Sequence, residues 1–312
     1  MKLTSSLALL SAALFAAAPA SAFELTHSEG TLKLDATPKK VVSFDVAVLD
    51  TLAALDVPVV GVPGSTYEGA LARYQDTKVV GTLFEPDYAV LREIQPELIF
   101  AGGRSQKAVP ELNKLAPTVS FASDTHAFMD TFRAANLALG KAFGKEEQAA
   151  AALARIDQNL ESLQQANKGK KGAVIFTMKG NVIPHVPGDR FGYAYELTGL
   201  ESVLPAKDPN TPVAPRPEPN SPEAKAAAEQ RAQAIAGIAQ AEPDWLLVLD
   251  RGAINNGERT AADTLAKHPQ LGQTQAFKQG RVVYLDPQGW YVVGGGLNNL
   301  QAITASMLAQ MK

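Results

Sequence analysis

Three arginines occupy matching contexts in this chain, each after an apolar run typical of a buried strand and beside glycine or aspartate. They are Arg104 in Leu-Ile-Phe-Ala-Gly-Gly-Arg, Arg190 in Val-Pro-Gly-Asp-Arg-Phe-Gly and Arg251 in Leu-Leu-Val-Leu-Asp-Arg-Gly. In open α/β sheets, ligands bind outside the carboxyl ends of the strands. A guanidinium offers a permanent charge, planar donors and a face that stacks on aromatic rings. The three contexts therefore predict a pocket for a compact anion.

A tyrosine joins this group. Trp290-Tyr291 comes shortly after an apolar run at 281–285 and just before Val-Val-Gly-Gly-Gly and a final helical pattern. This order puts Tyr291 in the same zone as the arginines, and a phenolate is a hard oxygen donor suited to ferric iron. Tyr291 is therefore a candidate for ligand binding and for metal ligation, with a packed aromatic pair as the alternative. Further candidates for the pocket are Tyr67, His185, Trp290 and Arg216.

The sequence gives less support to ion pairs at these arginines, to a histidine metal site and to catalysis. Each arginine could instead be solvated or form an ion pair, for which Asp189 and Asp250 are adjacent partners. The four histidines are scattered and lack metal-ligand spacing. There is no nucleophile elbow, phosphate-binding loop or paired-carboxylate motif. We therefore expect no catalytic residue and no intrinsic cofactor.

The first 22 residues have the pattern of a secretory signal peptide. Lys2 supplies positive charge, residues 7–18 form a short apolar stretch, and Ala-Ser-Ala ends at Ala22 before Phe23. The alternative is a buried N-terminal helix. The chain has no cysteine, which excludes disulfides and an acylated anchor, and its net charge of −3 is unsuited to general nucleic-acid binding. We expect a soluble periplasmic monomer after cleavage near Ala22.

Apolar runs at 40–44, 59–62, 98–100 and 118–121 alternate with helical patterns, and the alternation restarts after residue 170 with runs at 173–176, 245–249 and 281–285. This predicts an α/β fold of two lobes with mostly parallel central sheets. Between them, residues 145–168 predict one long rigid helix with apolar residues on one stripe, or else an ordinary surface helix. The expected lobes are 23–144 and 169–312. The proline-rich stretch 205–222, which carries Arg216, is expected to be a surface loop, either a plain linker or a pocket rim.

Several segments resemble the helical-backbone periplasmic binding proteins that serve ABC importers. The resemblance runs from about residue 36 to the C-terminus and rests on Thr-Pro-Lys-Lys-Val-Val at 37–42, Gln-Pro-Glu-Leu-Ile at 95–99, Glu-Pro-Asp-Trp-Leu at 242–246 and the segment 276–286. Pro-Gly-Asp-Arg-Phe-Gly at 187–192, Leu-Asp-Arg at 249–251 and Trp-Tyr at 290–291 are similar to motifs of the catecholate-siderophore subgroup.

The resemblance implies a ferric siderophore of catecholate type as ligand and an ABC transporter permease as partner. It implies that Arg104, Arg190 and Arg251 surround the catecholate oxygens and that Tyr291 can complete the iron coordination. The subgroup's iron-liganding loop histidine has no counterpart in the proline-rich segment, which leaves a hexadentate ligand or a variant geometry open. Importer docking has only Glu85 and Asp87 as nearby candidates. The alternatives are a haem or corrinoid binder of the same fold, a secreted enzyme, and a metal-ion receptor or adhesin.

Overall fold

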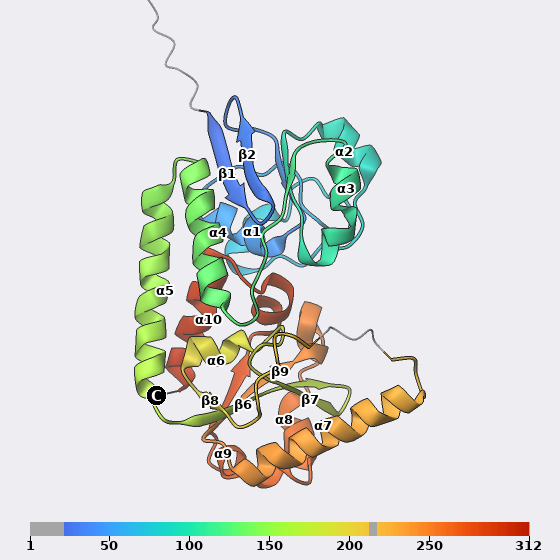
Figure 1. The fold of residues 1–312 in the computed structure, drawn as a ribbon, viewed down its shortest axis with the longest axis vertical. Helices are drawn as coiled ribbons and strands as arrows, with labels where there is room; N and C mark the ends of the chain where they lie inside the picture. The colour runs from blue at the N-terminus through green and yellow to red at the C-terminus, as the bar shows by residue number, and fades with distance from the viewer. Residues whose placement is uncertain (1–21, 212–216, 312) are drawn as a thin grey trace, which may run out of the picture.

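The computed structural model describes residues 22–211 and 217–311 and shows an α/β protein with two lobes (Figure 1). The predicted fold class is thereby confirmed. The predicted signal peptide lies almost wholly within residues 1–21, and Arg216 lies within 212–216, so both fall outside the described residues. No helix in the described part of the chain is long and apolar enough to cross a membrane.

The N-terminal lobe contains an antiparallel hairpin and a three-stranded parallel sheet in the order β3-β4-β5. Its strands are β1 (Phe23–His27), β2 (Gly30–Leu34), β3 (Val41–Ser43), β4 (Leu98–Phe100) and β5 (Thr118–Val119). Its helices are α1 (Val46–Ala54), α2 (Tyr88–Ile94), α3 (Val109–Leu112) and α4 (Phe128–Ala142). The run at 59–62 makes only isolated bridges instead of the predicted strand.

The C-terminal lobe is built on a sheet in the order β10-β9-β6-β7, with β8 beside β6. The strands are β6 (Lys171–Met178), β7 (Asn181–His185), β8 (Glu201–Ser202), β9 (Trp245–Asp250) and β10 (Val282–Leu285). All neighbouring strands are parallel except β7, which is antiparallel to β6. The helices are α6 (Tyr193–Thr198), α7 (Pro222–Ala241), α8 (Ala261–Lys267), α9 (Gln275–Lys278) and α10 (Leu297–Gln310). Since β9 is buried along its whole length, its sequence is a continuous apolar run instead of an alternating one.

The long helix α5 (Glu146–Ala166) lies within the predicted 145–168 and runs beside both lobes (Figure 1). Its buried stripe includes Leu153, Ile156, Leu160 and Leu163, at the three- and four-residue steps that the sequence shows. The lobes are also joined by α10, which packs on both α5 and α1. The predicted lobe boundaries at 144 and 168 stay predictions.

Candidate functional site

The side chain of Tyr291 lies at the centre of the arginine cluster. Tyr291 belongs to a π-helical turn, Gln288–Val293, that follows β10. The guanidinium carbons of Arg251, Arg190 and Arg104 lie 4.8, 5.2 and 5.8 Å from the centre of its ring. Arg104 comes from the N-terminal lobe and the other two come from the C-terminal lobe. Both lobes thus contribute positive charge to one aromatic ring.

Arg104 also fixes the backbone of this turn. It follows β4 through Gly102 and Gly103, and Gly103 has φ +53°, a left-handed conformation that glycine adopts without strain. Its Nη1 donates to the Val292 carbonyl at 3.0 Å, and its Nη2 donates to the Tyr291 carbonyl. Burial, and then repulsion by Arg190, lower the pKa of Arg104. A bound anion would relieve that repulsion.

The aspartates beside the arginines are occupied by other donors. Asp189 accepts from His185 Nδ1 at 3.0 Å and from the backbone of the Val186–Phe191 turn. Asp250 accepts from the backbone N–H groups of Gly252, Thr260 and Ala261. Among the described residues, no carboxylate forms an ion pair with any of the three arginines. The alternative that Asp189 and Asp250 neutralise them is therefore not what the structure shows.

Arg190 reaches the site by a different route from the predicted one. Because β7 is antiparallel, its last residue, His185, pairs with Val174, whereas Asp250 pairs with Thr177 nearer the carboxyl end of β6. The rule of carboxyl strand ends therefore accounts for Arg104 and Arg251 but is wrong for Arg190. The turn after β7, with Gly188 at φ +86°, carries Arg190 back to the cluster.

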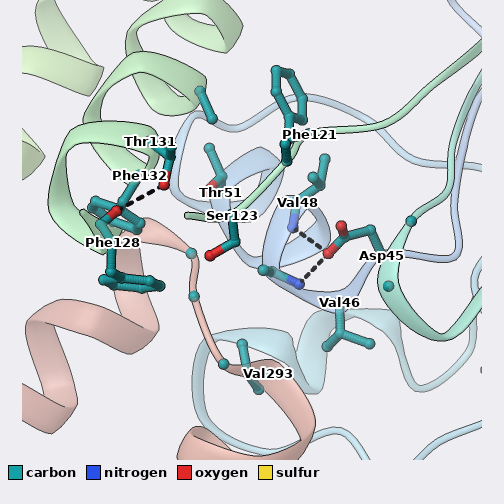
Figure 2. A pocket seen from close by; sticks show the side chains of 18 of the residues that line it. Asp45, Val46, Val48, Thr51, Phe121, Ser123, Phe128, Thr131, Phe132 and Val293 are labelled. Atoms are coloured by element: carbon teal, nitrogen blue, oxygen red, sulfur yellow. Dashed lines mark hydrogen bonds between the residues drawn. The ribbon is translucent and has the colours of Figure 1, made fainter. Parts of the chain in front are cut away.

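A cavity of about 310 Å³ adjoins the cluster (Figure 2). It lies between α1, α4, the loop at 121–125 and the glycines at 294–296, and Arg104, Arg190 and Trp290 contribute to its wall. Trp290 is buried and stacks on Tyr193, with their ring centres 4.9 Å apart. Tyr193 in turn stacks on Phe128, with their ring centres 4.2 Å apart. Arg251 and Tyr291 lie beside this cavity and not in its wall. The site thus has a cationic part and an aromatic part.

Two of the further candidates lie elsewhere. Tyr67 is buried in a separate apolar cluster, and its hydroxyl donates to the Pro63 carbonyl at 2.6 Å. His185 is held by Asp189 and packs against Phe176 and Phe191, outside the cavity wall. The prediction from sequence missed Asp45, which lines the cavity and lies two residues after the end of β3, although the rule used for the arginines would have found it. In the described part of the chain, no group of three or more histidines, aspartates and glutamates could hold a metal ion.

The chain belongs to the periplasmic binding protein family, whose model matches residues 41–288. It is 32% identical over 274 residues to the petrobactin-binding protein YclQ of Bacillus subtilis, across 86% of this chain and 81% of that relative. The crystal structure of YclQ superposes with a TM-score of 0.78 at 27% identity, covering 94% of this chain and 99% of that one. The crystal structure of the periplasmic catecholate-siderophore binding protein VctP of Vibrio cholerae superposes with a TM-score of 0.74 at 25% identity, covering 93% of this chain and 99% of that one.

Proposed function

We propose that this protein binds a ferric siderophore of catecholate type at the Tyr291 cluster and delivers it to the permease of an ABC importer. The observation that carries the proposal is the group of three arginines around one tyrosine ring, with no carboxylate among the described residues paired to any of them. Three cations held together without counterions favour an anionic ligand. The similarity to VctP, a periplasmic catecholate-siderophore binding protein, supports the same ligand class.

The chemistry of the ligand fits the geometry. A ferric catecholate complex is anionic, rich in oxygen acceptors and flat-faced. Guanidinium groups provide charge-assisted hydrogen bonds to such oxygens and stack on aromatic faces. Because all three arginines already contact the Tyr291 ring and Arg104 also donates to two backbone carbonyls, little side-chain entropy is lost when the ligand binds.

Tyr291 has one of two roles in this proposal. With a hexadentate siderophore, the iron shell is complete and the phenol ring supports the arginines. With a ligand that leaves coordination positions open, the phenolate oxygen supplies one of them. The protein itself then needs neither an intrinsic cofactor nor a catalytic residue, and it acts as a periplasmic monomer after cleavage near Ala22.

Fluorescence titration tests the proposal. Trp290 lines the cavity, so ferric catecholates are expected to quench tryptophan emission with a saturable dependence on concentration. The double replacement of Arg190 and Arg251 by alanine removes two charge-assisted contacts, each of about 1.5–3 kcal/mol. It should weaken ligand binding by a factor on the order of 10²–10⁴. Arg92→Ala, which removes an exposed arginine of α2, is the control with unchanged affinity expected.

Absorbance, fluorescence and mass spectrometry together separate the alternatives. Haem binding would give a shifted Soret band, and corrinoid binding would quench emission without iron. Saturable binding of haem or a corrinoid, with no response to ferric catecholates, would replace the proposed ligand. Turnover of the bound ligand, followed by mass spectrometry, would instead indicate an enzyme.

A further inference from the structure

The cavity of Figure 2 continues the site away from the arginines. Arg104 and Arg190 line one part of it. The rest of the wall is mainly apolar, with aromatic rings from α4 and the loop before it and aliphatic side chains from α1 and the turn after Tyr291. Labelled in the figure are Phe121, Phe128, Phe132, Val46, Val48 and Val293. A group bound here would be in contact with the anion site yet surrounded by apolar atoms.

Most polar groups in this wall already have partners. Thr51 Oγ1 donates to Asn136 Oδ1 at 2.6 Å, and Asn136 Nδ2 donates to the Phe132 carbonyl at 2.7 Å. Thr131 Oγ1 donates to the Phe128 carbonyl at 3.0 Å (Figure 2). An oxygen-rich anion placed against these side chains would lose its water without gaining donors, at a cost of several kcal/mol. The part of the wall formed by Thr51, Thr131 and Asn136 therefore favours an uncharged group of low polarity.

Two side chains in this wall are exceptions: Tyr193, whose buried hydroxyl has no hydrogen-bond partner in the described part of the chain, and Asp45. Asp45 Oδ1 caps α1 by accepting from Ala47 N at 2.9 Å and Val48 N at 3.2 Å (Figure 2). Its Oδ2 lies on the side of Gly102, and no donor among the described residues bonds to it. Asp45 is partly buried, and burial raises its pKa. A hydrogen-bond donor brought by a ligand would stabilise its ionised form.

We propose that this cavity is a second subsite, which takes an uncharged, mainly apolar arm of the ligand whose N–H group donates to Asp45 Oδ2. This inference rests on the proposed siderophore function and names a feature of its ligand. A neutral N–H, such as that of an amide, fits better than an ammonium because Arg104 and Arg190 line the same cavity and repel a further cation. The preferred ligand thus combines an anionic ferric chelate with an amide-bearing arm.

Three synthetic probes test the subsite. They are the ferric complexes of one tripodal tris-catecholamide that carries no arm, an acetamidobutyl arm, or the same arm with its amide nitrogen methylated. Each buried methylene contributes a factor of about four, so burial of two or three of the four methylenes should make both armed probes bind roughly 10–100-fold tighter than the plain one. The N–H arm should bind about tenfold tighter than the methylated arm, which cannot donate to Asp45.

Two variants assign these gains to the cavity. Asp45→Asn keeps a residue that caps helices well, but its amide nitrogen replaces the accepting Oδ2, so the preference for the N–H arm should disappear. Ala135→Leu fills the cavity from α4 and should remove the advantage of both arms while the plain probe binds unchanged. Ala134→Leu, at an exposed position of the same helix, is the matched control.

The outcomes separate this inference from the function on which it rests. If the plain probe binds and both arms add nothing, or if Ala135→Leu weakens all three probes equally, the subsite is refuted while the siderophore function stands. An unchanged preference for the N–H arm in Asp45→Asn refutes the role of Asp45. If none of the three probes binds the wild-type protein, the proposed function itself fails.

Discussion

Asp50 is a buried carboxylate at the joint between the two lobes. It belongs to α1, is only 2% exposed, and accepts from the backbone N–H of Asn299 in the first turn of α10 at 2.9 Å. A negative charge is favoured at a helix N-terminus. Burial nevertheless outweighs this bond and raises the pKa of Asp50 from 3.8 to about 6. The joint therefore holds a carboxyl group whose pKa lies about two units above its ordinary value.

The sign of the pH effect follows from this shift. Between about pH 4 and pH 6 the folded protein retains a proton on Asp50 that the unfolded chain has released, so stability falls as pH rises through this window. Above pH 6 the ionised group costs about 3 kcal/mol, at 1.36 kcal/mol for each pKa unit. Asp50→Asn keeps the size and an acceptor but cannot ionise. We expect it to stabilise the fold by up to about 3 kcal/mol at pH 7.5 and by only a few tenths at pH 4.

Urea denaturation at the two pH values measures this difference. The quantity to compare is the change in unfolding free energy between variant and wild type, since the titration of other groups then cancels. Asp76→Asn makes the same change of charge at an exposed position and should leave stability close to that of wild type at both pH values. A variant that is less stable than wild type at pH 7.5, or whose gain is the same at both pH values, would show that the bond to α10 outweighs burial.

Three further predictions concern the site and its supports. For a hexadentate ligand, Tyr291→Phe should weaken binding less than alanine at both Arg190 and Arg251, by fluorescence titration; the opposite order would indicate iron–tyrosinate coordination. Glu196 on α6 accepts from two backbone N–H groups at the start of α4, so Glu196→Ala should lower stability by about 1 kcal/mol in urea; no change would mean that water replaces it. Gly296 has φ +82°, and an added Cβ would clash with a carboxylate oxygen of Asp50, so Gly296→Ala should lower the melting temperature; an unaltered midpoint would contradict this packing.

Much of the fold follows from local sequence patterns. The apolar runs at 98–100 and 245–249 correspond to β4 and β9, and the stripe on 145–168 corresponds to α5. These patterns are informative because a strand buried on both faces requires consecutive apolar residues and a helix requires them at three- and four-residue steps. The apolar run at 59–62 was predicted to be a strand but makes only isolated bridges. Strand pairing depends on partners distant in sequence, and here those partners supply single bridges and no continuous ladder.

The site was predictable in part. Arg104 and Arg251 follow parallel strands, so sequence order alone placed them at one edge of each sheet. Arg190 was the right type of residue, but the argument for its position was wrong because strand direction depends on pairing with β6. Asp45 was missed although it follows β3 much as Arg104 follows β4. The aromatic residues of α4 were missed because nothing local indicates that α4 crosses the site.

The sequence by itself determined which groups this protein can offer to a ligand, because the charge of an arginine and the donor oxygen of a tyrosine are local properties. Only the tertiary structure decided that three guanidinium groups from two lobes face the ring of Tyr291. It also decided that Asp189 accepts from His185 and Asp250 accepts from backbone N–H groups. The three arginines are therefore left without a carboxylate partner in the described part of the chain. These outcomes depend on the pairing and packing of segments far apart in sequence, which local pattern does not encode.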